Sequence, residues 1–166
     1  KQAQQVILDG LSKLEYRGYD SAGILTNENG KLVTIKRSGR LDNLRRELEG
    51  NELVGTCGMG HTRWATHGPP TDRNAHPHGT DRVKIIHNGI IENYLSLASE
   101  LREKGFSFSS DTDTEIAACY VDSCYTGDPI AAIVKALDGI EGSYALSIMF
   151  ADFPNTLYAV RKDGPL

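Results

Sequence analysis

Four short segments of this 166-residue sequence combine arginine, histidine, asparagine, aspartate and glycine in a way that is unusual for purely structural elements. They are residues 16–23 (YRGYDSAG), 61–68 (HTRWATHG), 87–93 (HNGIIEN) and 112–115 (TDTE). Each falls at the end of a predicted strand or helix, where binding and catalytic residues are commonly placed. We therefore take these segments as candidate parts of a functional site.

Arg63 and Asp113 are suited to recognise a free amino acid. A planar guanidinium can bind a carboxylate through two hydrogen bonds, and an aspartate can accept hydrogen bonds from an ammonium group. The alternatives are a surface salt bridge, or an Asp113 that is favoured by the dipole at the start of a helix. These two residues taken alone favour the alternatives.

Asn88 and Gly89 could together hold a developing oxyanion, through the side-chain amide of one and the backbone N–H of the other. Glycine allows the backbone to approach a reacting carbonyl closely. Asn-Gly is also a common hairpin turn. The following segment, 90–95, is predicted to run into a helix, which weakens the hairpin interpretation without excluding it.

All five histidines lie between His61 and His87, and His76-Pro77-His78 forms an HxH pair. A metal-dependent hydrolase is the obvious alternative function for such a cluster. Metal sites usually add carboxylates or thiolates at regular spacing, on strands or helices. Pro77 and the nearby Asn74 are more typical of a shaped loop, so we predict no metal site.

The elements that must position these segments are short. Two β-like runs, 22–26 and 31–36, flank Asn29-Gly30, which predicts a hairpin. Apolar residues at helical spacing predict a first helix that ends near Gly18 and a short second helix. Their apolar stripes are Ile7, Leu11 and Leu14, and Leu41, Leu44 and Leu48.

Residues 57–62 and 83–87 are predicted strands, separated by a loop rich in proline and histidine. An amphipathic helix is predicted at 92–104, and the pattern of Thr112 and Glu115 predicts a capping box before the next helix. Asp128-Pro129 is typical of a further helix start, and 144–150 with 156–160 form a predicted strand pair. Short turns indicate antiparallel pairing, so we expect an α+β fold in layers.

The composition excludes several classes of protein. The net charge is −4 with no basic cluster, which argues against a nucleic-acid partner. No apolar stretch approaches the ~20 residues that cross a bilayer, so no membrane partner is expected. The three cysteines are odd in number and form no CxxC pair, which favours buried thiols and a cytoplasmic location.

The four segments, together with residues 74–78 (NAHPH), resemble the class II glutamine amidotransferase domain of the N-terminal nucleophile hydrolases, in the form found in glucosamine-6-phosphate synthases. They occur in the family's order and spread across most of the chain, so the resemblance is more specific than any single motif. It implies an α+β fold, a four-layer αββα sandwich of antiparallel sheets. Residues 1–166 would be a partial domain without its N-terminal nucleophile strand and C-terminal strands.

The resemblance implies a role for each matching residue in binding glutamine. Arg63 would bind the α-carboxylate and Asp113 the α-ammonium group. Thr66 and His67 would line the same pocket. Trp64 would belong to a loop that closes over the bound substrate.

The resemblance also implies a mechanism. Asn88 and Gly89 would form the oxyanion hole, and Arg17 would lie near the nucleophile. In the family, an N-terminal cysteine attacks the side-chain amide with its own α-amine as general base. A glutamyl thioester forms, ammonia leaves, and water releases glutamate. No cofactor takes part.

In the whole enzyme of the family, the ammonia passes to a sugar-isomerase domain of the same chain, where fructose 6-phosphate becomes glucosamine 6-phosphate, and the enzyme is expected to be a homodimer. None of Cys57, Cys119 and Cys124 matches the nucleophile, so we expect the chain as written to be inactive. The alternative is a non-catalytic module that senses glutamine without hydrolysing it.

Overall fold

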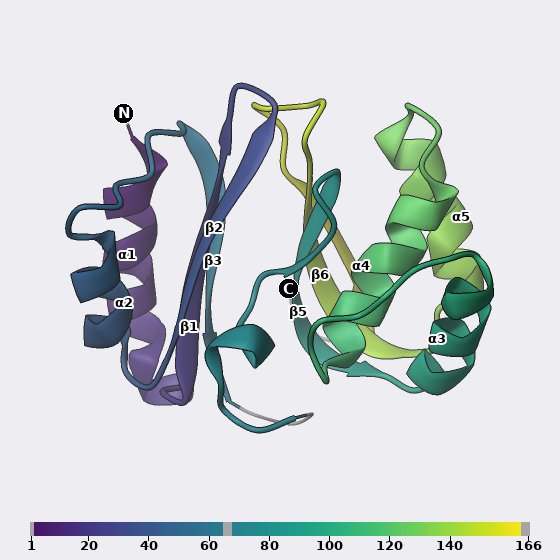
Figure 1. Cartoon of the computed structure of the whole chain (residues 1–166), viewed down its shortest axis with the longest axis horizontal. Coiled ribbons are helices and arrows are strands. Elements are labelled where there is room, and N and C mark those ends of the chain that lie inside the picture. The colour runs from purple at the N-terminus through teal and green to yellow at the C-terminus, as the bar shows by residue number, and fades with distance from the viewer. Residues whose placement is uncertain (1, 65–67, 164–166) are drawn as a thin grey trace.

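The computed structural model describes residues 2–64 and 68–163. It has four layers: two helices, a three-stranded sheet, a four-stranded sheet and three further helices (Figure 1). The first half comprises α1 (Ala3–Leu14), a 3₁₀ turn (Glu15–Arg17), β1 (Ser21–Glu28), β2 (Lys31–Ser38), α2 (Leu41–Leu48) and β3 (Cys57–Arg63). The second half comprises a 3₁₀ turn (Asp72–Asn74), β4 (His78–Gly79), β5 (Val83–Ile91), α3 (Tyr94–Glu103), α4 (Asp113–Cys124), α5 (Pro129–Gly139), β6 (Gly142–Phe150) and β7 (Tyr158–Lys162).

The first sheet has the strand order β2-β1-β3 and is antiparallel throughout. The predicted hairpin is confirmed, because Asn29 and Gly30 both adopt positive φ, at 54° and 95°. This backbone matches the twist of the two strands that the turn joins. Helices α1 and α2 cover the outer face of the sheet (Figure 1).

The apolar stripe of α1 differs from the predicted one. Leu8 and Leu11 are buried against β1 and α2, and Ile7 packs beside them. Leu14 is 45% exposed, because the helix gives way to the 3₁₀ turn immediately after it. The stripe of α2 is confirmed, since Leu41, Leu44 and Leu48 are all buried.

The second sheet has the order β4-β5-β6-β7, and its outer face is covered by α3, α4 and α5 (Figure 1). β5 pairs with β6 along its whole length. The α5 start is confirmed, because the Asp128 carboxylate accepts from the backbone N–H groups of Ile130 and Ala131 and Pro129 follows at the first helical position. The largest core cluster lies between this sheet and its helices.

The inner faces of the two sheets share a much smaller core, of which Leu25, Met59 and Met149 are the buried members. Asn27 adds a polar bridge across this seam. Its side-chain amide donates to the carbonyls of Phe150 and Ala151, at 3.1 and 3.0 Å. The expected α+β fold with antiparallel sheets is therefore confirmed. None of the helices within the described residues is both long and apolar enough to span a bilayer.

Candidate functional site

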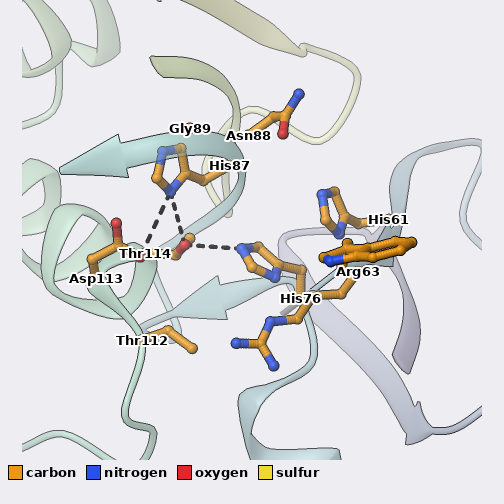
Figure 2. A pocket seen from close by; sticks show the side chains of 10 residues that line it. His61, Arg63, His76, His87, Asn88, Gly89, Thr112, Asp113 and Thr114 are labelled. Carbon is orange, nitrogen blue, oxygen red and sulfur yellow. Dashed lines mark hydrogen bonds and ion pairs between the residues drawn. The ribbon is translucent and has the colours of Figure 1, made fainter. Parts of the chain in front are cut away.

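A cavity at one end of the seam between the sheets brings the candidate residues together (Figure 2). The cavity is small, with an internal volume of about 50 Å³. The end of β3, the loop after it, β5 and the first turn of α4 supply its walls. The lining residues are His61, Arg63, Trp64, His76, His87, Asn88, Gly89, Thr112, Asp113 and Thr114.

Arg63 is the last residue of β3 and is only 3% exposed. Its guanidinium donates to the carbonyls of Gly68 and Pro69, at 3.2 and 3.4 Å. Burial lowers the pKa of Arg63, and the carboxylates of Asp20 and Asp113 oppose that effect. Because it is a buried cation with carbonyl partners, Arg63 is not part of a surface salt bridge.

Asp113 is the first residue of α4 and is also 3% exposed. One carboxylate oxygen accepts from the backbone N–H of Ile91, at 2.9 Å, which ties the helix start to the end of β5. The position agrees with a favourable helix dipole. Asp113 is also buried in the cavity wall, where its charge acts on that of Arg63. The dipole interpretation alone did not predict this burial.

The capping box before α4 is half confirmed. The Thr112 hydroxyl accepts from the backbone N–H of Glu115, at 3.3 Å. The Glu115 carboxylate instead accepts from the backbone N–H groups of Ser109 and Ser110, at distances of 2.6 to 3.1 Å. It therefore orders the loop that leads into the cavity wall.

Asn88 and Gly89 lie inside β5, opposite Ala145 and Tyr144 of β6. The hairpin interpretation is therefore wrong. The strand continues to Ile91, and the helix that we expected at 92–104 begins only at Tyr94. Gly89 has φ of 127°, and a Cβ there would stand 2.2 Å from the carbonyl oxygen of Ser143, so the position requires glycine.

A buried hydrogen-bonded cluster forms the wall behind these residues. The Thr114 hydroxyl lies 2.8 Å from Nε2 of His76 and 3.0 Å from Nδ1 of His87. The His61 and His76 rings lie 4.4 Å apart between centroids. Burial lowers the pKa of His61 to about 4 and that of His76 well below its usual value, and neighbouring positive charges act in the same direction.

At neutral pH the imidazoles of His61 and His76 are therefore uncharged. Among residues 2–64 and 68–163, no group of three or more histidine, cysteine, aspartate or glutamate side chains is placed to hold a metal ion. Sequence reasoning did not assign His61, His76, His87 or Thr114 to the site. The partners of Thr114 lie 38 and 27 residues away along the chain, and only the motifs NAHPH, HNGIIEN and TDTE pointed toward this cluster.

The loop between β3 and β4 is fastened to the approach of α4 by Asn74, which is fully buried. The Asn74 amide nitrogen donates to the Pro69 carbonyl at 3.0 Å and to the Asp111 carboxylate at 3.1 Å, and the amide oxygen accepts from the Asp111 backbone N–H at 2.9 Å. The Pro69 carbonyl also accepts from Arg63. Asn74 thus supports the Pro69 carbonyl, one of the two acceptors of the Arg63 guanidinium.

Trp64 lines the cavity mouth but is 62% exposed, with its ring 5.6 Å from that of Tyr19 in an edge-on contact. Thr66 and His67, which we predicted to line the same pocket, lie outside the described residues. Arg17 lies at a second cavity, which it shares with His61, Thr62 and Asn88. Asn88 lines both cavities, whereas Arg17 lines only the second.

The three cysteines lie elsewhere in the described part of the chain. Cys57 begins β3, and Cys119 and Cys124 belong to α4. Burial raises the pKa of the Cys119 thiol to about 12, so this thiol is a poor nucleophile. No cysteine is among the residues that line the described cavity.

Comparison with known proteins identifies the family. A family profile described as "Glutamine amidotransferase domain" matches residues 61–163, which include every residue that lines the cavity. The chain belongs to the glutamine amidotransferase family. Within that family it is homologous to glutamine–fructose-6-phosphate aminotransferase (isomerizing). It is 51% identical to that protein of Clostridium acetobutylicum over 168 residues and 49% identical to that of Pyrococcus horikoshii over 170, and both alignments cover the whole chain.

The amidotransferase chain spans 28% of the length of these relatives. Among solved structures, it resembles the glutamine phosphoribosylpyrophosphate amidotransferase from B. subtilis, with a TM-score of 0.77 and 27% identity over 91% of this chain and 33% of that one. A class II glutamine aminotransferase domain protein from Silicibacter pomeroyi gives a TM-score of 0.61 over 86% of this chain and 68% of that one. At 16% identity this likeness concerns the fold alone.

Proposed function

We propose that the cavity binds L-glutamine and is the site where this amidotransferase domain releases ammonia from it. The observation that carries the proposal is that Arg63, Asp113, Asn88 and Gly89, from three separate segments, line one cavity. A cation and an anion in one small cavity match the two charges on the α-carbon of an amino acid. A polar strand edge beside them leaves a place for an uncharged side-chain amide.

In this assignment Arg63 binds the α-carboxylate and Asp113 the α-ammonium group. The carbonyl oxygen of the side-chain amide faces Asn88 and Gly89, which stabilise the negative charge that develops on it. The family resemblance assigns Trp64 to a loop that closes over the bound substrate, and Thr66 and His67 to the lining of the same pocket. A thiol adds to the amide carbon, the C–N bond breaks with transfer of a proton to nitrogen, and a thioester and ammonia result; water then cleaves the thioester to glutamate.

The family's nucleophile is an N-terminal cysteine, and Arg17, beside Asn88, would lie close to it. We further propose that the ammonia serves the conversion of fructose 6-phosphate to glucosamine 6-phosphate, with a sugar-isomerase domain and a homodimeric enzyme. Support for this step comes from the names of the relatives, which are glutamine–fructose-6-phosphate aminotransferases.

The binding assignment is tested by titration calorimetry with L-glutamine, L-glutamate and D-glutamine. We expect binding of L-glutamine and a loss of affinity of about 10- to 100-fold in Arg63→Met, because about 1.5–3 kcal/mol is typical of hydrogen bonds to a charged group. Arg46→Met on the exposed face of α2 is the matched control and should bind as the unchanged chain does. Equal affinity in the Arg63 and Arg46 variants would contradict the assignment.

A second candidate function is glutamine sensing without hydrolysis. It is favoured by the observation that no cysteine lines the described cavity. Both candidates predict the same binding, so calorimetry does not separate them. Ammonia release from L-glutamine, measured in a coupled assay on the protein in its native form, does: sustained release supports the glutaminase, and binding without release supports the sensor.

A further inference from the structure

The segment that carries His76 passes from the first sheet to the second (Figure 1). It lies directly on β1, because a Cβ at Gly23 would stand 1.9 Å from the His76 carbonyl oxygen. Two residues later the segment joins the second sheet as β4, which pairs with β5. Its backbone carbonyls on either side of His76 need hydrogen-bond partners from outside the segment.

Lys36 supplies such a partner from the first sheet. It lies opposite Gly23 in the pairing of β1 with β2, so its side chain leaves the sheet on the face that carries the segment. Its Nζ donates to the carbonyls of Arg73 and Pro77, at 3.2 and 3.3 Å. One ammonium group therefore binds both ends of residues 73–77.

Lys84 supplies a partner from the second sheet. It lies opposite Met149 in the pairing of β5 with β6, and Met149 belongs to the small core between the sheets, so the Lys84 side chain enters the same seam. Its Nζ donates to the Gly79 carbonyl at 2.9 Å. Residues 73–79 are thus bound by two lysines, one from each sheet.

The two lysines are unfavourably placed as charges. Burial and then the charge of Lys84 lower the pKa of Lys36 to about 8, against the opposing effects of Glu115 and Asp72. Burial also lowers the pKa of Lys84. A charge that is partly removed from water needs hydrogen-bond partners, and the carbonyls of residues 73–79 provide them for both lysines.

The segment that the lysines bind supports the cavity at two points. The His76 side chain lines the cavity itself. The Asn74 amide donates to the Pro69 carbonyl, which also accepts from the Arg63 guanidinium. A shift of residues 73–79 would therefore move part of the cavity wall and disturb an acceptor of Arg63.

We propose that Lys36 and Lys84 are positioning residues for the cavity, which set its affinity for the ligand by fixing residues 73–79 from opposite sheets. Neither lysine is among the residues that line the described cavity, so both act through the segment. The proposal rests on the proposed function for the identity of the ligand. The fixing of residues 73–79 does not depend on that identity and is measured separately.

Calorimetry with L-glutamine tests the effect on binding. Lys36→Met keeps the length of the side chain but removes the donor, so the affinity should fall on the order of tenfold. Lys36→Arg should recover most of this loss, because a guanidinium can also donate to two carbonyls. Lys31→Met, at the exposed start of the same strand, is the matched control and should bind as the unchanged chain does. Equal affinities in the Lys36→Met and Lys31→Met variants would overturn the proposal.

Hydrogen exchange measured by NMR on the unliganded chain separates positioning from general stability. In Lys36→Met the backbone amides of Asn74 and Ala75 should exchange faster, while those of α5 keep the rates of the unchanged chain. Equally faster exchange in both places would show a general loss of stability and would remove the positioning role.

Lys84→Met carries the same two measurements if Lys36→Met does not fold, because it removes only the hydrogen bond at Gly79. Its expected effects have the same direction, and unchanged affinity and exchange in a folded Lys84→Met would overturn the role of that lysine. An unchanged chain that fails to bind L-glutamine would end the proposed function. The exchange rates of Asn74 and Ala75 would still decide whether the lysines fix the segment.

Discussion

Acidification should destabilise this domain through the histidines around the cavity, and the half-buried His61 gives the sharpest measure of the effect. Its pKa is lowered from 6.5 to about 4 in the folded chain, chiefly by burial. As the pH falls below 6.5, the unfolded chain binds a proton at this position before the folded chain does, so the free energy of unfolding decreases. The loss continues until about pH 4, below which both states are protonated.

The size of the effect follows from the pKa difference. One pKa unit corresponds to about 1.4 kcal/mol, so His61 alone should reduce the free energy of unfolding by about 2 kcal/mol between pH 7 and pH 5. By pH 4 the reduction should reach about 3 kcal/mol. The lowered pKa values of His76 and His78 add to the loss in the same direction.

The assay is urea unfolding followed by circular dichroism at pH 7 and pH 5, on the unchanged chain and on His61→Phe. Phenylalanine keeps a ring against His76 but does not titrate. The decrease between the two pH values should be smaller in the variant by about 2 kcal/mol. An equal decrease in both proteins, or a His61 ring that titrates near pH 6.5 by NMR in the folded chain, would refute the reasoning.

Two further substitutions test the supports of the site. Asn74→Ala removes the hydrogen bonds that join Asp111 to Pro69, so we expect the free energy of unfolding to fall by about 2 kcal/mol and L-glutamine binding to weaken. Urea unfolding and calorimetry measure the two effects, with the exposed Asn43→Ala as control. Full affinity in Asn74→Ala would show that Arg63 needs no such support. Gly89→Ala forces a side chain into a positive φ and against the Ser143 carbonyl. It should lower the free energy of unfolding by about 3 kcal/mol in the same urea assay, and a stability equal to that of the unchanged chain would contradict the close pairing of β5 with β6 at this position.

Features that depend on neighbouring residues were predictable from the sequence. Asn29-Gly30 forms the predicted turn because both residues tolerate positive φ, and Asp128-Pro129 begins a helix because the carboxylate satisfies backbone donors that the helix leaves open. The failures are non-local. The sequence after Asn88 looks helical, but β6 pairs with it and extends the strand to Ile91.

The candidate site was predictable only in part, and for the same reason. Arg63 and Asp113 taken alone favoured a surface salt bridge or an Asp113 placed by the helix dipole, and it was the chain of motifs that indicated a shared pocket. The structure places both in one cavity, while their roles in glutamine binding stay predictions. Thr114 had no visible function, because its meaning depends on His76 and His87, which only the folded chain brings beside it.

The small core between the two sheets means that a ligand in the cavity can contribute to holding the sheets together. Arg63 belongs to one sheet, whereas Asn88 lies on the other and Asp113 on the helix that covers it, and between the sheets the buried contacts are few. A ligand that contacts Arg63, Asn88 and Asp113 together would link the two separately packed halves of the domain. Ligand binding should therefore reduce the relative motion of the two sheets. Hydrogen exchange of the backbone amides in β1 and β6 should then slow, even at positions far from the ligand.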